Sequence, residues 1–428
     1  MAKFALSGKN PLQGEIEVRG SKNAVLKVFA SSILFNKPIL VKNAPLVSDV
    51  FKMGDLIKGL GGKIERQGER TFKIFGNKTD SFSLDKEISK HLRSSIVLLG
   101  PLLARFKKVN FVYPGGCVIG KRPIDFFLNG FSKMGAKIKE NGESFAMSTK
   151  ELKGAEIFFR ERSVTATEAL MMAAVSAKGK TILRNAAQEP EVKHLADFLA
   201  DSGARIKGAG TSVIEIEGFG DKIFKGLNPR EEKREFMTPS DRIEAGSFAV
   251  LGALLGKNLV IRKIIPEELS SVLACFDQIG IRYELGKNWL RISKADKIAG
   301  LNLKTEPYPG FPTDLQPIFA VLLTQAKGES LIFETVFEGR LEYINELNRM
   351  GAKIMLCDPH RIIINGPTSL KGREMESPDL RAGLAFTLSA LIAEGKSVIH
   401  NIEHIDRGYE KIDERLQKIG AKIKRISQ

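Results

Sequence analysis

The chain has few of the residues on which disulfide frameworks and metal sites depend. Its 428 residues include three cysteines, five histidines and one tryptophan. An odd, small number of cysteines in a chain of this length indicates a reducing, cytoplasmic setting without disulfides. The histidines and cysteines show no metal-ligand spacing, so no metal site is expected. No apolar run reaches the roughly 18 residues of a membrane span, and no signal peptide is visible.

Nucleotide-binding motifs are also missing. There is no Walker loop and no GxGxxG after a strand, so no nucleotide cofactor is expected. The charge is strongly positive: 66 Lys and Arg against 50 Asp and Glu give a formal net charge of +16. This excess allows a nucleic-acid-binding module as an alternative function. Because no basic tract alternates with aromatic residues, a groove for small anionic substrates is the preferred interpretation.

The chain does contain a six-fold repeat. In each copy a stripe of apolar residues, typical of an amphipathic helix, ends at a glycine that would stop the helix. Arg340 is an exception to the fifth stripe, and Ser202 to the third. The copies are about 70 residues long, more than a solenoid unit, so each is predicted to be a small α/β module. The marker glycines are Gly61, Gly135, Gly203, Gly280, Gly351 and Gly420.

A second helix is predicted in each copy. Helix-length segments such as 24–35, 96–104, 248–255 and 382–393 are apolar nearly all round, which indicates buried helices. A lysine and a short apolar strand follow each of them. The order in each copy is therefore buried helix, strand, amphipathic helix and further strands, and six copies divide naturally into two domains of three. The marker lysines are Lys37, Lys108, Lys180, Lys257, Lys327 and Lys396.

Basic residues recur at matched positions near the helix starts. At a constant distance before the marker lysines stand Lys22, Arg93, Arg242 and Arg381, with Thr165 and Pro312 in the other two copies. At a second matched position, the predicted start of the amphipathic helix, stand Arg122 and Arg407. A cation opposes the dipole of a helix N-terminus, and solvated surface charge would not predict such recurrence. We therefore expect these cations to surround a bound anion.

Three further residues are candidates for chemistry. Cys117 lies in a loop, 114–125, whose glycines supply backbone freedom and whose basic residues Lys121 and Arg122 would lower the pKa of a thiol; the alternative is an exposed thiol without function. Asp314 stands just inside a predicted helix start, where it is either functional or complements the helix dipole. Asp379 would pair with Arg381 or cap the helix. Cys275, in an amphipathic stripe, is expected to be inert packing.

These motifs resemble those of the enolpyruvyl transferases, and among them the UDP-N-acetylglucosamine 1-carboxyvinyltransferases, essentially end to end. The resemblance implies an α/β fold, an inside-out α/β barrel with two domains of three repeated units each, buried helices and outward-facing sheets. It also implies domains of 21–235 and of 1–20 with 236–428, and an active site in the cleft between them. The segments that carry the resemblance are 20–24, 114–125, 185–191, 241–246, 311–316, 334–340, 379–381 and 404–410.

The implied reaction is transfer of the enolpyruvyl group of phosphoenolpyruvate to the 3-hydroxyl of UDP-N-acetylglucosamine, with release of phosphate. In this family that is the first committed step of peptidoglycan synthesis, and fosfomycin is its inhibitor. The alternative within the enzyme class is 5-enolpyruvylshikimate-3-phosphate synthase, which lacks the Pro-Gly-Gly-Cys loop. The implied partners are the two substrates, with no nucleic acid, no membrane and no cofactor; the oligomeric state stays open.

The resemblance also implies residue roles. The catalytic residues would be Cys117, Asp314, Lys22 and Arg407, with Asp314 taking the hydroxyl proton and Cys117 protonating C3 or promoting product release. The sequence departs from the family pattern at Lys27, Glu161, Thr165 and Gly339. The implied substrate-binding residues are Lys22, Asn23, Arg93, Arg122, Pro123, Asp125, Ser163, Val164, Asp314, Val336, Arg340, Asp379, Arg381 and Arg407.

Overall fold

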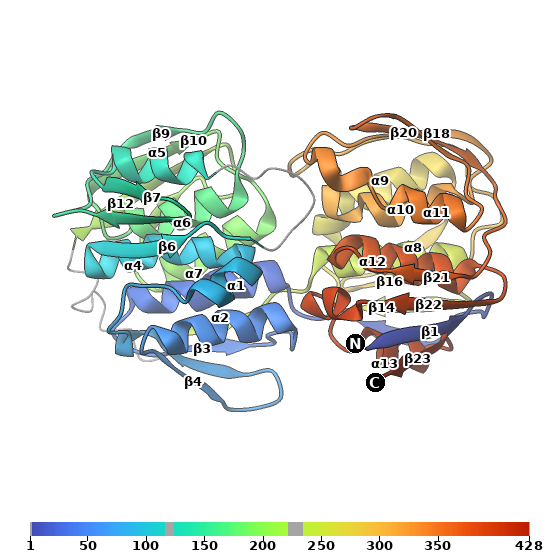
Figure 1. The fold of residues 1–428 in the computed structure, drawn as a ribbon, viewed down its shortest axis with the longest axis horizontal. Helices are drawn as coiled ribbons and strands as arrows, with labels where there is room; N and C mark the ends of the chain where they lie inside the picture. Colours follow the sequence, from blue (N-terminus) through green and yellow to red (C-terminus); the bar gives the residue numbers. More distant parts are fainter. Residues whose placement is uncertain (1, 116–123, 221–233, 428) are drawn as a thin grey trace. The chain divides into compact units, whose positions relative to one another are not determined.

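The computed structural model describes residues 2–115, 124–220 and 234–427, and backbone contacts divide the chain into two compact units. The terminal unit combines the first residues, up to Arg19, with the chain from Ser240 onward, and the central unit runs from Gly20 to Pro239 (Figure 1). Strand β13 (Arg234–Met237) pairs in parallel with β3 (Ile39–Lys42), which places the last residues before Pro239 in the central unit.

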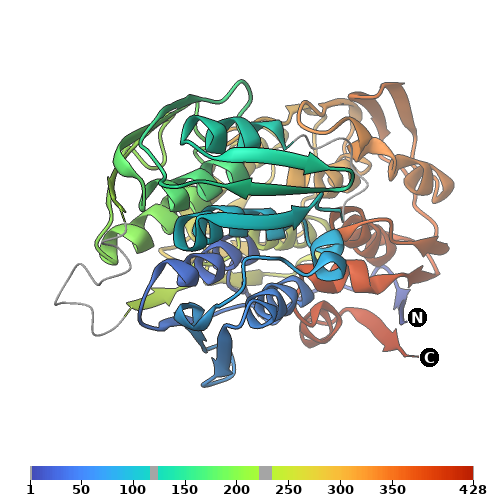
Figure 2. The ribbon, with the colours of Figure 1, turned by 60° about the vertical axis from the view of Figure 1, so that its left-hand side comes forward.

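Among its described residues the central unit has three helices that are buried nearly all round, three amphipathic ones and the short helix α3 (Lys86–His91). Its sheets have the strand orders β13-β3-β5-β4, β6-β8-β7 and β11-β12-β10-β9. Figure 2 shows the second of these (teal) as an outer layer with helices behind it. The buried helices are α1 (Lys22–Ser31), α4 (Leu99–Phe106) and α6 (Val164–Ala174), and the amphipathic ones are α2 (Ser48–Gly59), α5 (Asp125–Lys133) and α7 (Pro190–Asp201). The remaining strands are β4 (Lys63–Arg66), β5 (Phe72–Phe75), β6 (Lys108–Val112), β7 (Lys137–Asn141), β8 (Ser144–Ser148), β9 (Glu156–Phe158), β10 (Lys178–Arg184), β11 (Arg205–Lys207) and β12 (Val213–Phe219).

The terminal unit repeats the same plan. Its sheets have the orders β15-β16-β14-β2, β17-β18-β20-β19 and β21-β22-β1-β23, and β1 (Lys3–Ser7) joins it by pairing with both β22 and β23. The buried helices are α8 (Arg242–Leu255), α10 (Gln316–Leu323) and α12 (Leu380–Ile392), and the amphipathic ones are α9 (Ser270–Ile279), α11 (Ile344–Arg349) and α13 (Ile412–Lys418). The other strands are β2 (Glu15–Glu17), β14 (Leu259–Arg262), β15 (Tyr283–Leu285), β16 (Trp289–Ile292), β17 (Asn302–Lys304), β18 (Gly328–Phe333), β19 (Ile354–Asp358), β20 (Arg361–Gly366), β21 (Glu374–Glu376), β22 (Lys396–His400) and β23 (Lys422–Ile426).

The six marker glycines confirm the repeat. Each adopts a left-handed backbone, with φ between +79° at Gly280 and +105° at Gly420. In every copy the residue after the glycine donates its backbone N–H to the carbonyl five residues earlier, as Ile281 does to Phe276 at 2.9 Å. This is the hydrogen bond of a Schellman motif, which ends a helix by satisfying a free carbonyl. The predicted order of buried helix, strand and amphipathic helix is confirmed in all six copies.

Small residues let the buried helices approach one another. A Cβ atom built on Gly100 of α4 would lie 2.1 Å from the carbonyl oxygen of Ala169 in α6, so only glycine fits there. Side chains packed this tightly form one apolar core in each unit. The α/β class is confirmed, and no sheet of the described strands closes on itself. The inside-out barrel stays a prediction. Among the described residues no helix has the length and apolar character to span a membrane.

A substitution at Gly280 tests the left-handed stop. Nothing lies within 4 Å of a Cβ placed there, so only the backbone conformation opposes a side chain. Gly280→Ala is expected to lower the free energy of unfolding by about 1 kcal/mol, since left-handed φ strains an L-residue. Gly280→Asn, the matched control, should lose less of the free energy of unfolding, because asparagine tolerates a left-handed backbone better than alanine does. Urea unfolding followed by fluorescence of Trp289, in the same unit, measures both; equal losses would contradict the interpretation.

Candidate active site

Two buried arginines of the terminal unit converge on one aspartate. An Nη2 atom of Arg340 donates to Oδ1 of Asp314 at 3.0 Å, and Nη2 of Arg381 donates to Oδ2 at 2.7 Å. The arginine side chains are 3% and 7% exposed, whereas that of Asp314 is 28% exposed. The carboxylate is therefore the solvent-facing member of a buried charge cluster, and it holds both guanidinium groups in place.

Three separate segments position this cluster. Asp314 lies in the 3-10 turn η6 (Thr313–Leu315) before α10, Arg340 in η7 (Glu338–Leu341), and Arg381 in the first turn of α12. Arg381 also donates to the Tyr409 hydroxyl at 2.8 Å. Burial by itself would lower the pKa of Arg381, but the charge of Asp314, the hydrogen bond to it, and the effects of Tyr409 and Asp241 together outweigh burial and raise the pKa. The guanidinium therefore stays charged although it is buried.

Arg340 interrupts the apolar stripe of the fifth copy because it, too, is paired with Asp314. Its side chain is buried like the apolar residues it replaces, and Asp314 supplies the opposite charge that makes this burial tolerable. Its guanidinium carbon lies 5.2 Å from the centre of the Phe337 ring, which adds a cation–π contact. A residue that is only an exception in the sequence is thus part of a site in the structure.

Asp379 is an N-cap. Its Oδ1 accepts from the backbone N–H groups of Arg381 at 2.7 Å and Ala382 at 3.2 Å. The two interpretations of Asp379, an ion pair with Arg381 and a helix cap, are decided in favour of the cap by these contacts.

A buried carboxylate shapes the loop beside Asp314. Glu334 is fully buried, and its Oε1 accepts from the N–H groups of Val336 at 2.8 Å and Phe337 at 3.1 Å. Its Oε2 accepts from the Thr313 hydroxyl at 2.8 Å. These bonds hold the loop with Val336 exposed and tie it to the residue before Asp314. Glu334 lies in a segment that carried the family resemblance, but sequence reasoning assigned it no role.

In the central unit, Lys22 and Asn23 form the first turn of α1, which Ser21 caps. The Lys22 ammonium donates to Oδ2 of Asp49 at 2.9 Å, and both side chains are buried. Asp49, in the first turn of α2, compensates a cation that would otherwise oppose the dipole of α1. Sequence reasoning missed Asp49; its only signal is a carboxylate near the start of an amphipathic helix.

Lys27, one turn further along α1, is also paired and buried. Its ammonium donates to the carbonyl of Asn23 at 2.7 Å and lies 3.3 Å from Oε2 of Glu168 in α6. Glu168 is fully buried, and burial raises its pKa to about 8, against the opposing effect of Lys27 and with support from Glu191. The unusual lysine therefore ties the backbone at Asn23 to a second buried helix.

The other predicted residues of the central unit lie at the starts of different helices. Arg93 begins η3 (Arg93–Leu98) and donates to the Pro114 carbonyl at 3.0 Å. Ser163 caps α6, whose first residue is Val164, by accepting from Ala166 N–H at 3.3 Å. Asp125 is the exposed first residue of α5.

The predictions for Cys117, Arg122 and Pro123 lie outside the described residues. The placement of Arg407 at the start of an amphipathic helix was wrong: it is the last residue of η8 (Ile402–Arg407), and α13 begins only at Ile412. The helix starts late because Lys411 adopts a left-handed backbone, φ +43°, that no helix continues through. Arg407 is half-buried.

Two further cysteines lie within the described residues. Cys275 is buried in α9, where burial raises its pKa to about 11, as expected of a packing residue. Cys357 is a free, exposed thiol. Within the described ranges, no group of three or more His, Cys, Asp or Glu residues is placed to hold a metal ion.

Comparison with known proteins gives the family. The family model for EPSP synthase (3-phosphoshikimate 1-carboxyvinyltransferase) matches residues 6–416. UDP-N-acetylglucosamine 1-carboxyvinyltransferase 1 of Carboxydothermus hydrogenoformans is 41% identical over 427 residues, which cover 100% of this chain and 99% of that protein. The UDP-N-acetylglucosamine 1-carboxyvinyltransferase of Pelagibacter ubique is 42% identical over 428 residues, with 100% of both chains covered. The chain belongs to the UDP-N-acetylglucosamine 1-carboxyvinyltransferase family.

Solved structures support the fold of this UDP-N-acetylglucosamine 1-carboxyvinyltransferase family member. The enolpyruvyl transferase NikO from Streptomyces tendae superposes with a TM-score of 0.88 at 22% identity, covering 100% of this chain and 99% of that one. EPSP synthase from Acinetobacter baumannii gives a TM-score of 0.75 at 20% identity, covering 100% of both. Structural likeness extends across enolpyruvyl transferases, whereas high sequence identity is found with the UDP-N-acetylglucosamine enzymes.

The charge cluster generates a first prediction. Asp314→Asn keeps the shape of the side chain but leaves two buried guanidinium groups without a counter-charge, so it is expected to destabilise the terminal unit by about 2–3 kcal/mol. Tyr409→Phe, the control, removes one hydrogen bond to Arg381 and should cost about 1 kcal/mol. Urea unfolding measures both. Inorganic phosphate should restore part of the stability of Asp314→Asn but not of Tyr409→Phe; no difference between the variants would contradict the cluster.

Glu168 generates a second prediction. Because the pKa of Glu168 is raised from 4.5 to about 8, the folded chain retains a proton that the unfolded chain loses as pH rises. This group therefore contributes most to stability below its unfolded pKa, and the contribution falls between about pH 5 and about pH 9. Glu168→Gln has no titratable proton at this position. As pH rises, the free energy of unfolding of the parent should therefore fall relative to that of Glu168→Gln. The exposed variant Glu217→Gln is the control; parallel pH profiles of parent and Glu168→Gln would contradict the prediction.

Proposed function

We propose that the chain transfers the enolpyruvyl group of phosphoenolpyruvate to the 3-hydroxyl of UDP-N-acetylglucosamine and releases phosphate. The proposal is supported by the relatives at 41% and 42% identity, which are named as UDP-N-acetylglucosamine 1-carboxyvinyltransferases, over the alternative of a 5-enolpyruvylshikimate-3-phosphate synthase. It places the reaction at the first committed step of peptidoglycan synthesis, in the cytoplasm. The proposal also includes an inside-out α/β barrel fold, in which each unit has three repeats with buried helices and outward-facing sheets.

The observation that carries the proposal is the pair of buried guanidinium groups on Asp314. Phosphoenolpyruvate presents a carboxylate and a phosphate close together, and arginine donates to both kinds of anion in a planar fork. Arg340 and Arg381 are held charged, buried and oriented before any substrate arrives. Such a preorganised cation pair suits the substrate carboxylate and needs no rearrangement when the anion binds.

In the proposed reaction, Asp314 takes the proton of the sugar 3-hydroxyl. The hydroxyl oxygen of the sugar then bonds to C2 of phosphoenolpyruvate while a proton adds to C3. Loss of a C3 proton and departure of phosphate from C2 then regenerate the double bond. General acid–base assistance of this kind contributes about 10²–10⁴ in rate. Cys117 would protonate C3 or promote product release, and Lys22, Arg122 and Arg407 would bind the phosphate.

The remaining roles follow the same proposal. Asn23 would orient the sugar, and its backbone is held by Lys27. Asp379 would lie near the pyruvyl methyl group; its carboxylate is already oriented by two backbone N–H groups. Arg93, Pro123, Asp125, Ser163, Val164 and Val336 would complete the substrate contacts. The proposal requires Lys22 and Asn23 of the central unit to act on the same substrates as Asp314 of the terminal unit.

The test is release of inorganic phosphate from phosphoenolpyruvate with UDP-N-acetylglucosamine as acceptor. Shikimate 3-phosphate is the control acceptor and should give no release. Asp314→Asn is expected to lose at least about 10²-fold in turnover, the range of general-base assistance, while calorimetry still detects binding of the nucleotide sugar. Release with shikimate 3-phosphate alone would overturn the proposal, and normal turnover of Asp314→Asn would refute the role of Asp314.

A further inference from the structure

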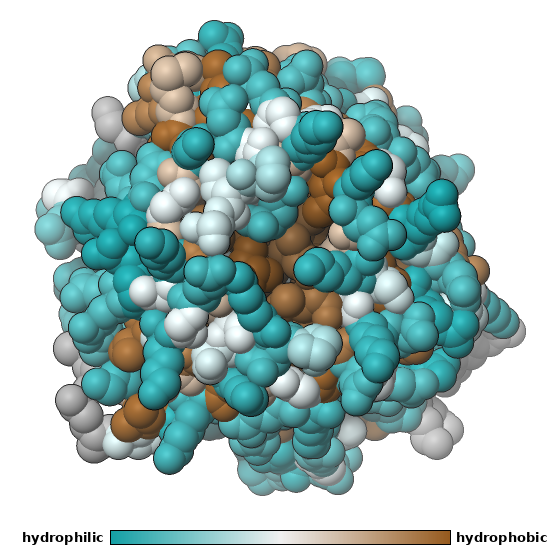
Figure 3. Space-filling view, turned by 90° about the vertical axis from the view of Figure 1, so that its right-hand side faces the viewer, coloured by the Kyte–Doolittle hydropathy of each residue, from teal (hydrophilic) through white to brown (hydrophobic). Residues whose placement is uncertain are grey.

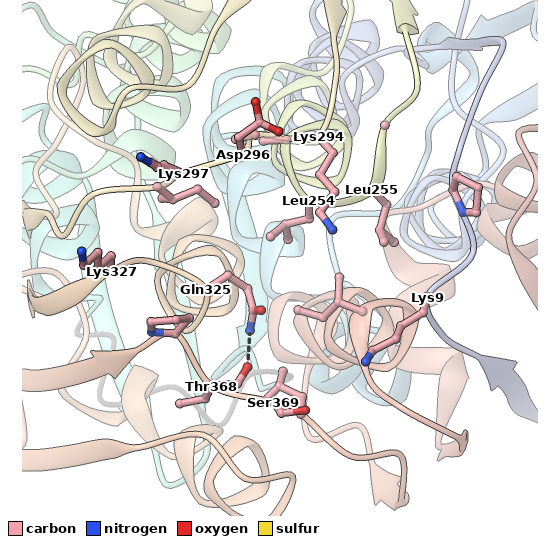
Figure 4. Close-up of a pocket in the computed structure, with 18 of the residues that line it drawn as sticks. Lys9, Leu254, Leu255, Lys294, Asp296, Lys297, Gln325, Lys327, Thr368 and Ser369 are labelled. Carbon is pink, nitrogen blue, oxygen red and sulfur yellow. Dashed lines mark hydrogen bonds between the residues drawn. The ribbon is translucent and has the colours of Figure 1, made fainter.

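A large hollow opens at the end of the terminal unit where α8, α10 and α12 finish. It has a volume of about 1070 Å³, and its apolar floor includes the buried Leu254 and Leu255 (Figure 4). The buried Ile298 and Leu370 and the half-buried Ile392 also line it. On the face that Figure 3 shows, an apolar depression is surrounded by hydrophilic side chains. All lining residues belong to one unit, so the hollow is complete within it. Asp314, Arg340 and Arg381 do not line it.

The rim of the hollow is strongly cationic. Five lysines line it, against one carboxylate, that of Asp296. Figure 4 shows Lys9 and Lys294 beside the apolar floor, and Lys297 with Lys327 on another side. Lys9 forms an ion pair with Glu394. The other four side chains, of Lys257, Lys294, Lys297 and Lys327, are exposed and form no ion pair with any residue that the structure describes.

These lysines are not needed to satisfy the helix ends. Cations are favourable near helix C-termini, which is the structural alternative for such a ring. Here, however, backbone N–H groups bind the terminal carbonyls: Ala295 donates to Ala253 at 2.9 Å, Lys9 to Leu391 at 2.8 Å and Thr368 to Thr324 at 2.9 Å.

In the central unit, basic side chains also donate to the free carbonyls at the ends of the buried helices. At the corresponding helix ends, the Arg105 side chain donates to the Ile33 carbonyl at 2.9 Å, and the Lys107 side chain donates to the Ala104 carbonyl at 2.9 Å. Basic side chains therefore add to the backbone caps in the central unit, whereas the ammonium groups of Lys257, Lys294, Lys297 and Lys327 donate to no helix-end carbonyl among the residues that the structure describes.

We propose that this hollow is a binding site for a small amphiphilic anion, one with an apolar body and a single carboxylate or phosphate group. The apolar body would cover the leucine and isoleucine floor, and the anionic group would lie among the rim lysines. A volume of about 1070 Å³ accommodates a drug-sized ligand. The site is separate from the proposed reaction and stands even if the proposed function fails.

Isothermal calorimetry with sodium dodecanoate, below its critical micelle concentration and with the full chain, tests the proposal. Saturable binding is expected, weaker at high salt because the rim is solvent-exposed. The variant Lys294→Gln/Lys327→Gln should bind about fivefold more weakly, as expected for two partly solvated ion pairs. Ala295→Glu, which adds a carboxylate to the lining, should abolish binding. The exposed pair Lys287→Gln/Lys422→Gln removes the same charge elsewhere and should leave affinity unchanged.

Two further ligands decide the chemistry. Dodecyltrimethylammonium has the same apolar body with the opposite charge and is expected not to bind, whereas inorganic phosphate alone should bind at least tenfold more weakly than dodecanoate. The proposal is overturned if dodecanoate does not saturate, if the cationic analogue binds equally well, if phosphate alone matches dodecanoate, or if the control pair of lysines weakens binding as much as the rim pair.

Discussion

The structure depends on one constraint: each unit buries three helices on all sides, so every polar group at the ends of those helices needs a partner inside the protein. Water cannot supply these partners in a close-packed core, and an unpaired buried group costs as much as a lost hydrogen bond. Small residues such as Gly100 make the packing possible, and side chains or neighbouring backbone satisfy the ends.

The two ends of the buried helices have different chemistry. In the terminal unit, Asp379 caps the N-terminus of α12, while Arg381, in the first turn of the same helix, is paired with Asp314. At the N-terminus of α1, Lys22 is paired with Asp49. These two cations, Lys22 and Arg381, would oppose the helix dipoles, and each is compensated and oriented by a carboxylate from another segment. At the opposite ends, Lys9 is paired with Glu394, whereas the other four lysines around the hollow form no ion pair with a carboxylate of the described residues.

Compensation of buried charge also explains why some residues break the repeat. Arg340 replaces an apolar residue in the fifth stripe and is buried there because Asp314 is 3.0 Å away. Lys27, which the resemblance marked as a departure from the family pattern, is buried 3.3 Å from Glu168. In both positions an irregularity in one segment is matched by an acidic residue far away in the chain. Neither pair could be assigned from periodicity, which describes each segment alone.

The sequence by itself determined the repeat, the order of elements in it, the helix stops and the cations at the helix starts. These follow from local physics, because a left-handed glycine ends a helix and an apolar stripe buries one face, whatever the rest of the chain does. Motif resemblance pointed to the family, and comparison confirmed it. Only the tertiary structure decided the partners: Asp49 for Lys22, Glu168 for Lys27, Asp314 for both arginines, and a cap rather than an ion pair for Asp379. It also corrected Arg407, which lies before its helix. Partner choice is non-local, since it depends on which segments the packed core brings within a few ångströms of one another.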